Sequence, residues 1–207
     1  VLRDVDKMWE NVDKDDRLKS MKKPERDEAA AILLYTLEWC PKDGSLYHIL
    51  NKTLVSRDRD QKLQSWLLFL RLLLVGLSKR PIVKNITVSR GIPHLVDYSG
   101  KQEVTWWPLS STSRKREAAE AFAFKSKEST LFVMNIRSGR NIEGLSNYPE
   151  EKDVLLPPMT HFAIKRREKD GDRLTIVYMD EIDTMRDSPM PIILRRENTN
   201  LTDNDLE

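Results

Sequence analysis

The chain has 207 residues, of which 39% are hydrophobic, and this is enough to bury one large core or two small lobes, so a disordered protein is excluded. Charged residues make up 33%, but the formal net charge at pH 7 is only +2, so no overall field attracts nucleic acid or an anionic membrane surface. The single cysteine, Cys40, excludes an internal disulfide.

The first 81 residues are expected to form a helical lobe. Apolar residues recur at helical spacing in the charged segment 1–23, which indicates a leading helix or an arm. Pro24 and the acidic residues after it begin the next helix in the favoured way, and the turn at residues 41–44 ends it. Helices are accordingly predicted at residues 1–23, 24–39, 45–54 and 66–77, and the apolar run 63–77 is expected to be a buried helix.

From residue 82 the pattern changes to short runs of β-branched and aromatic residues separated by turns. One compact helix interrupts them at residues 114–124, and Gly171 marks a tight hairpin turn. Strands are predicted at residues 86–90, 103–107, 130–136, 154–156, 161–165 and 174–179. We therefore divide the chain into a helical lobe at 1–81, a β-rich core at 82–195 and a flexible polar tail at 196–207.

Signals of location and modification are few. The chain opens at Val1 without a secretory signal, which favours a processed protein or a piece of a longer one. The run 63–77 is too short and too mixed to span a bilayer, so a cytoplasmic location is favoured over a secreted one. Three Asn-x-Ser/Thr triplets begin at Asn51, Asn85 and Asn200; such triplets arise by chance and matter only in a secreted chain.

The first candidate motif is Arg90-Gly91, at the end of the first predicted strand of the β-rich core. An arginine offers a bidentate fork to phosphate, and a neighbouring glycine lets a ligand approach the backbone. Most arginines on protein surfaces are merely solvated, so the motif alone is weak.

The second motif is a run of hydroxyl side chains at residues 110–113, which leaves a strand and enters the predicted helix at residue 114. Ser113 is expected to be the N-cap of that helix. The pair Trp106-Trp107 precedes the run and could form an aromatic wall, although core packing of at least one indole is the simpler interpretation.

The third motif is the acid pair Glu151 and Asp153, which stands at the mouth of an apolar strand. Because side chains alternate along a strand, both acids share one face with Leu155, while Val154 and Leu156 face the other way. A solvated acidic turn before a core strand is the competing interpretation.

In this order, the three motifs resemble the arginine, Ser-Thr-Ser and Glu-x-Glu pattern of the mono-ADP-ribosyltransferases. The likeness is to the eukaryotic, arginine-modifying branch, which is related to cholera-like toxins. It extends to residues 34–36, 46–47, 50–51 and 146–150, and covers roughly residues 29–178. The resemblance implies an α+β fold, with an N-terminal helical lobe followed by a two-sheet β-sandwich and a central cleft that binds NAD.

The same resemblance implies roles for single residues. Arg90 would pair with the NAD phosphates, and Gly91 would offer its backbone to the nicotinamide amide. Ser111 would hold the nicotinamide ribose and the catalytic acid in place, with Thr112 and Ser113 completing the cofactor-binding set. NAD would serve as co-substrate, a protein arginine as acceptor, and the protein would act as a monomer.

The two acids would divide the chemistry. A carboxylate beside the ribose stabilises the positive charge that develops as the bond to nicotinamide breaks, and the resemblance gives this role to Asp153. A second carboxylate, Glu151, would orient and deprotonate the acceptor guanidinium. No metal is expected, because His48, His94 and His161 are scattered along the chain without acidic or thiol neighbours at ligand spacing.

The family has glutamate at the position of Asp153, and aspartate is shorter by one methylene. A displacement of about 1 Å at a reacting centre can cost roughly a hundredfold in rate. Three functions therefore remain open at this point: an arginine-specific transferase, an NAD glycohydrolase in which water replaces the acceptor, and an NAD-binding module with weakened catalysis.

Overall fold

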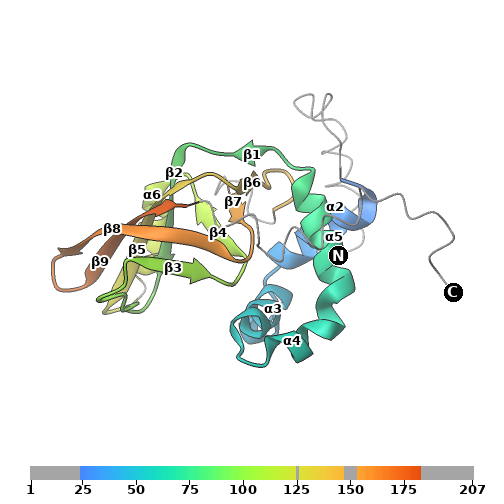
Figure 1. Ribbon diagram of the computed structural model, residues 1–207, viewed down its shortest axis with the longest axis horizontal. Helices are drawn as coiled ribbons and strands as arrows, with labels where there is room; N and C mark the ends of the chain where they lie inside the picture. The colour runs from blue at the N-terminus through green and yellow to red at the C-terminus, as the bar shows by residue number, and fades with distance from the viewer. Residues whose placement is uncertain (1–23, 125, 147–152, 183–207) are drawn as a thin grey trace, which may run out of the picture.

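A computed structural model describes residues 24–124, 126–146 and 153–182. Helices gather at one end of the molecule and strands at the other, and the chain passes from the first group to the second after residue 79 (Figure 1). The predicted α+β class is therefore confirmed. The predicted helix at residues 1–23 and the predicted tail at 196–207 lie outside the described residues.

Four α-helices precede the first strand in the described part of the chain. The first of them starts with a capping contact. The carboxylate of Glu28 accepts a hydrogen bond of 2.7 Å from the backbone N–H of Glu25, the N-cap residue, which would otherwise have no partner within the helix. Short 3₁₀ turns lie at Lys42–Gly44 and Leu63–Trp66. The α-helices are α2 (Arg26–Thr36), α3 (Leu46–Val55), α4 (Arg59–Lys62) and α5 (Leu67–Ser78).

The apolar run at residues 63–77 differs from its predicted form. Its first residues form a 3₁₀ turn, and α5 begins only at Leu67. Leu73 and Leu77 are buried in the helical lobe, whereas Leu68 is 81% exposed. The expectation of a helix buried as a whole was therefore wrong, because α5 packs on its neighbours along one face only.

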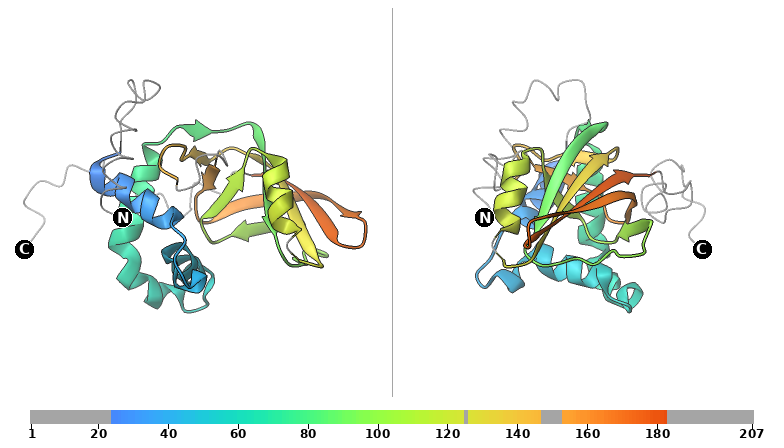
Figure 2. Two further views of the ribbon diagram at one scale, coloured as in Figure 1. Left: turned by 180° about the vertical axis from the view of Figure 1, so that it is seen from behind. Right: turned by 90° about the vertical axis from the view of Figure 1, so that its left-hand side faces the viewer.

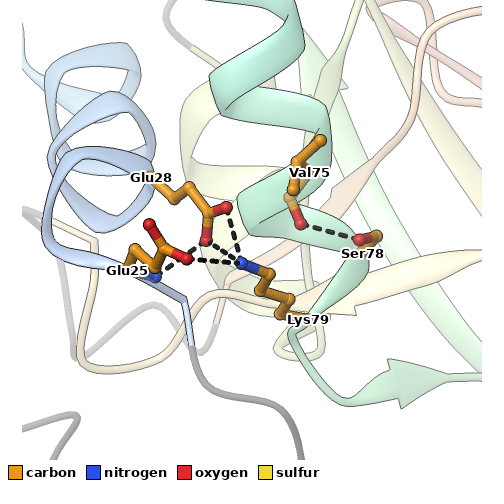
Figure 3. Close-up of polar contacts among 5 residues, drawn as sticks. All are labelled: Glu25, Glu28, Val75, Ser78 and Lys79. Carbon is orange, nitrogen blue, oxygen red and sulfur yellow. Dashed lines mark hydrogen bonds and ion pairs between the residues drawn. The ribbon is translucent and has the colours of Figure 1, made fainter. Parts of the chain in front are cut away.

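A buried ion pair joins α2 to α5 (Figure 3). The Lys79 Nζ lies 2.6 Å from each carboxylate oxygen of Glu28, and both side chains are almost fully buried. The helices also approach closely at Gly76, where a Cβ atom would lie only 3.0 Å from the Cβ and the backbone oxygen of Glu28. The glycine therefore permits the close crossing that the ion pair needs.

Within the described residues nine strands follow, with one helix among them, α6 (Arg116–Ala123). Each of the six predicted strands is present, and the longest, at residues 160–170, extends well past its predicted end. Gly171 forms the predicted hairpin turn with a φ of 64°, a conformation that favours glycine. The strands are β1 (Ile82–Val83), β2 (Ile86–Ile92), β3 (Glu103–Trp106), β4 (Ser110–Ser113), β5 (Ser129–Ile136), β6 (Gly139–Asn141), β7 (Asp153–Leu156), β8 (Thr160–Asp170) and β9 (Leu174–Glu181).

The strands form one hydrogen-bonded sheet in the order β1-β6-β7-β4-β2-β5-β9-β8-β3. Among the strand pairs that the described residues form, only β5 and β9 run parallel. The join between β4 and β2 rests on a single residue pair, Ser89 with Ser113, and there the sheet divides into two halves. A shared core holds Val154 and Leu156 from one half and Phe132 from the other. The expected two-sheet sandwich thus takes the form of one continuous sheet whose halves face each other across a core.

Helical elements cover the outer faces of this sheet. Helix α6 lies against β2 and β5, with Ala119 and Ala123 packed on Leu131 (Figure 2). The helical lobe packs on the other half, where Leu155 of β7 joins the core formed by α2, α3 and α5. Alternate residues of β7 therefore enter different cores, as their predicted alternation requires.

Candidate active site

The sheet brings the three sequence motifs onto neighbouring strands. Arg90 and Gly91 lie on β2, the hydroxyl run forms β4, and Asp153 begins β7. Ser113 pairs with Ser89 on one side and with Asp153 on the other. Residues that are more than sixty positions apart in the sequence thus share one stretch of sheet, beside the bend between its halves (Figure 1).

Arg90 connects the two strands that the sheet joins most weakly. Its Nη1 donates a hydrogen bond of 2.6 Å to the backbone carbonyl of Ser111. The side chain is half-buried, and this burial lowers the pKa of the guanidinium, while nearby Tyr35 and Tyr47 raise it in part. Within the described part of the chain the guanidinium makes no second hydrogen bond, so its remaining donors are available to an anion.

Gly91 has a packing reason to be glycine. A Cβ atom at this position would lie 1.9 Å from the backbone oxygen of Ala119 in α6, closer than any contact between these atoms allows. The residue is buried and pairs with Leu131 of β5. Sequence reasoning assigned Gly91 to ligand approach, and close packing of the helix on the strand is a second requirement that the sequence did not reveal.

The last three of the four hydroxyls of β4 lie in different environments. Ser111 is exposed, whereas Thr112 and Ser113 are buried. The Thr112 hydroxyl donates to the backbone oxygen of Val154 at 2.8 Å and so ties β4 to β7. Of the three side chains, that of Ser111 is therefore the one most open to a ligand.

Ser113 was predicted to be the N-cap of α6, and this prediction was wrong. The helix begins at Arg116 with Lys115 as its N-cap residue. The Ser113 hydroxyl instead accepts a hydrogen bond of 3.0 Å from the backbone N–H of Lys115, and it holds the turn that leads from β4 into the helix. Two residues of turn separate the hydroxyl from the helix because β4 continues through Ser113.

The acid pair is only partly described. Asp153 is the first residue of β7, and its backbone pairs with Ser113. Glu151 lies outside the described residues. Beyond Asp153 the predicted alternation is confirmed, since Leu155 joins the core of the helical lobe while Val154 and Leu156 join the core between the sheet halves.

The helical lobe contributes polar residues that sequence reasoning did not include among the site residues. The Tyr35 hydroxyl donates to the backbone carbonyl of Leu109 at 3.1 Å, and the Asn51 Nδ2 donates to both of these oxygens, at 3.0 and 3.1 Å. Burial raises the pKa of the Tyr35 phenol, so it stays a neutral donor. These contacts fix the segment that enters β4. In the sequence, likeness to the transferases at residues 34–36 and 50–51 was the only signal that pointed to them.

The tryptophan pair divides between core and surface. Trp106 is buried against Phe132 and Phe162, with ring centres 5.0 and 5.1 Å apart. Trp107 is half-buried, and the guanidinium of Arg59 stacks 3.8 Å from its ring centre. The prediction that at least one indole packs in the core is confirmed.

Among the residues that the structure describes, no group of three or more histidine, cysteine, aspartate or glutamate residues is placed to hold a metal ion. No helix formed by these residues is long and apolar enough to cross a membrane.

Comparison with protein families gives a match over most of the chain. A family model described as NAD:arginine ADP-ribosyltransferase matches residues 2–187. The chain is 36% identical over 70 residues to T-cell ecto-ADP-ribosyltransferase 2 of Mus musculus, which is 34% of this chain and 24% of that protein. It is 39% identical over 111 residues to ecto-ADP-ribosyltransferase 5 of Bos taurus, which is 52% of this chain and 33% of that protein. The matched segments thus span a third or less of these curated relatives.

Solved structures share the fold at lower sequence identity. The ADP-ribosyltransferase HopU1 of Pseudomonas syringae superposes with a TM-score of 0.66 at 19% identity, covering 86% of this chain and 87% of that one. The Vis toxin of Vibrio splendidus gives 0.60 at 21% identity, covering 87% and 83%. A variant of the eukaryotic mono-ADP-ribosyltransferase ART2.2 in complex with NAD gives 0.61 at 19% identity, covering 88% and 77%.

Proposed function

The chain belongs to the NAD:arginine ADP-ribosyltransferase family, and we propose that it transfers ADP-ribose from NAD to an arginine side chain of a protein, with release of nicotinamide. The observation that carries this proposal is the hydrogen bond from Arg90 to the Ser111 carbonyl, because it brings together the first two motifs at the bend of the sheet. Asp153 begins the next strand of the same sheet.

Arg90 is the proposed phosphate-binding residue. Its guanidinium uses one donor to reach β4, and its other N–H groups fit a diphosphate, which accepts several charge-assisted hydrogen bonds. Partial burial strengthens such a contact, since an ion pair is less screened away from bulk water. Tyr35 and Tyr47 lie close enough to influence the pKa of Arg90, and we include them in the proposed NAD site.

The hydroxyl side chains of β4 are proposed to hold NAD and the neighbouring strand in place and to take no part in bond breaking. The exposed Ser111 side chain supports a role in holding the nicotinamide ribose. Thr112 and Ser113 support the site from within, because their hydroxyls fix β4 to β7 and to the turn before α6. We retain Gly91 as the proposed backbone contact to the nicotinamide amide.

The acids are proposed to act on opposite sides of the transfer. NAD supplies the glycosidic bond that breaks, and Asp153 stabilises the positive charge that develops on the ribose. Glu151 orients the acceptor guanidinium and takes its proton, which is needed because an arginine has a pKa above about 12 and is otherwise no nucleophile.

One observation favours a second function. Residue 153 is an aspartate, whose side chain is one methylene shorter than the glutamate that the ADP-ribosyltransferase pattern has at this position. If the carboxylate of Asp153 is too far from the ribose for efficient transfer, the protein would hydrolyse NAD with water, or would bind NAD with little turnover. We keep both as alternatives to the transferase.

The names of the two curated relatives bear on location. Both are described as ecto-enzymes, and we propose that this chain likewise acts outside the cell or at its surface, in place of the cytoplasmic location expected from the sequence. The proposed acceptor is a protein arginine, and the proposed acting unit is a monomer. Surface biotinylation of cells that make the natural protein, together with detection of the protein in the medium, tests the location. Protein found only in the unlabelled intracellular fraction would overturn it.

A single assay separates the three functions. The protein is incubated with NAD, with and without agmatine as a soluble guanidinium acceptor, and both nicotinamide release and ADP-ribosyl-agmatine are measured. A transferase forms the adduct, a glycohydrolase releases nicotinamide without it, and a binding module does neither.

The matched control is Arg90→Lys, followed by calorimetric titration with NAD. Lysine keeps the charge but loses the planar fork, so we expect NAD affinity to fall by roughly tenfold or more. Unchanged affinity in a folded Arg90→Lys protein would contradict the phosphate assignment.

A further inference from the structure

The three Asn-x-Ser/Thr triplets lie in different surroundings. Asn200 is outside the described residues. Asn51 lies within α3, in the helical lobe. Asn85 lies in the turn between β1 and β2. The same three-residue pattern therefore occurs once inside a packed helix and once at an exposed turn, and the two can be compared directly.

Asn85 presents its side chain to solvent. Its φ of 59° is in the left-handed region, which asparagine adopts more readily than most residues, and its backbone N–H donates to the carbonyl of Ile136 at 2.7 Å. Its side-chain amide makes no hydrogen bond within the described part of the chain. Thr87, the third residue of the triplet, is also exposed, and its hydroxyl donates to the Asn135 side chain at 2.8 Å.

Asn51 is placed differently. Its Nδ2 donates two hydrogen bonds, to the Tyr35 hydroxyl and to the Leu109 carbonyl, and these join α3 to α2 and to the segment before β4. A substituent on this nitrogen removes at least one of these bonds and forces a bulky polar group between packed elements. The folded protein therefore has no room for a glycan at Asn51.

We propose that Asn85 is an N-glycosylation site of this protein and that Asn51 is not. The proposal rests on the extracellular location proposed above, because the modification takes place in the secretory pathway. The Asn85 Nδ2 forms a bond to C1 of an oligosaccharide carried on a lipid diphosphate. The C1–O bond to the lipid diphosphate breaks, the lipid diphosphate leaves, and the amide nitrogen loses one proton.

A glycan at Asn85 protects the weakest edge of the sheet. β1 is the outermost strand at that end and has only two residues, one of which, Ile82, is 53% exposed. An open sheet edge beside an exposed apolar side chain invites pairing with other chains, and a bulky polar substituent next to it blocks such pairing. Arg90 lies five residues further along β2, about 16 Å away at the rise of a strand, so the glycan leaves the proposed NAD site open.

To test the proposal, residues 1–207 are expressed in human cells behind an added secretion signal. The acceptor asparagines then enter the secretory pathway whatever the natural location is. Peptide N-glycosidase converts a glycosylated asparagine into aspartate, and peptide mass spectrometry then locates each conversion. We expect conversion at residue 85 and none at residue 51. Unmodified Asn85 in the secreted protein, or a glycan at Asn51, would overturn the proposal.

Three variants refine the result. All three are made in an Asn200→Gln background, so that the triplet at residue 200 adds no glycan. There, Asn85→Gln and Thr87→Ala should each abolish the mobility shift that the glycosidase causes, and Thr87→Ser should retain it, because serine also completes the triplet. The free energy of urea unfolding should fall by about 1 kcal/mol in Asn85→Gln, because glutamine adopts the left-handed backbone at residue 85 less readily than asparagine. The NAD turnover of this variant should be unchanged, whereas its tendency to self-associate, measured by light scattering, should rise. A shift that persists in Asn85→Gln would assign the glycan to another residue and refute the site.

Discussion

The contact between α2 and α5 and the join between β2 and β4 are held in opposite ways. The helix contact combines a buried ion pair, Glu28 with Lys79, and the close approach at Gly76. The strand join has one residue pair in the sheet ladder and the hydrogen bond from Arg90 to Ser111. The candidate site residues that the structure describes lie at or beside the second, weakly joined place.

The difference distinguishes residues that stabilise the fold from residues that can contact a ligand. At the contact between α2 and α5 the buried polar groups are paired with each other, as in the ion pair of Glu28 with Lys79. A bend where two strands barely pair leaves side chains such as Ser111 exposed and arginine donors available. Substitutions in the helix contact should therefore change stability alone, and substitutions of Arg90, Ser111 and Asp153 beside the strand join should mainly change activity.

The largest effect is expected from Lys79→Ala, which breaks the helix contact. It leaves the Glu28 carboxylate buried without its partner, and we expect a loss of about 3–5 kcal/mol in the free energy of unfolding, measured by urea denaturation. The double variant Glu28→Gln with Lys79→Met is the control, since it removes both charges and should recover most of the loss. A loss below about 1 kcal/mol for Lys79→Ala would show that the pair contributes no more than a surface ion pair.

Next in size is Asp153→Glu, which changes the site and should leave stability alone. Restoring the longer carboxylate should raise nicotinamide release and transfer to agmatine by up to roughly a hundredfold, equivalent to about 2.7 kcal/mol in the activation barrier. Glu151→Gln is the matched variant and should abolish transfer while slow hydrolysis of NAD continues. Equal loss of both activities in Glu151→Gln would contradict the proposed division between the two acids.

A smaller change, Tyr35→Phe, tests the link between the helical lobe and β4. It removes the donor to the Leu109 carbonyl and the acceptor for Asn51, and we expect a loss of about 1–3 kcal/mol at neutral pH. Because burial raises the pKa of Tyr35, its contribution is complete below the unfolded pKa of about 10 and is lost as the pH rises above it. Unfolding measured between neutral and alkaline pH should show this loss in the parent protein and a weaker one in Tyr35→Phe.

The smallest effect distinguishes Ser111 from Ser113, two of the three serines of β4. Ser113→Ala should lower stability by about 1 kcal/mol, because its buried hydroxyl holds the backbone N–H of Lys115. Ser111→Ala removes an exposed hydroxyl and should stay within about 0.5 kcal/mol of the parent protein while its turnover falls. The reverse ranking, with Ser111→Ala unstable and Ser113→Ala inactive, would assign the two hydroxyls the opposite roles.

The sequence alone determined the kinds of element and their order. Helical spacing before residue 80 and β-rich runs after residue 82 reflect local preferences, and α2, α3 and the six predicted strands all formed at or near the expected residues. The three motifs were found from residue type and order, and they led to the family that the comparisons then showed. Their roles in binding and catalysis remain predictions.

Features that depend on contacts between distant parts of the chain were decided by the tertiary structure. Strands β1 and β6 have two or three residues, and they form through pairing with each other and, for β6, with β7. A short window of sequence does not contain these partners. The exposed face of α5 could not be read from a run that is apolar on nearly all sides, because the face depends on which helices pack against it. The need for glycine at position 91 comes from a helix that begins twenty-five residues later, and the pairing of Glu28 with Lys79 spans 51 positions. Contacts between residues so distant in sequence are set by the packing of whole elements, and no spacing within the chain specifies them.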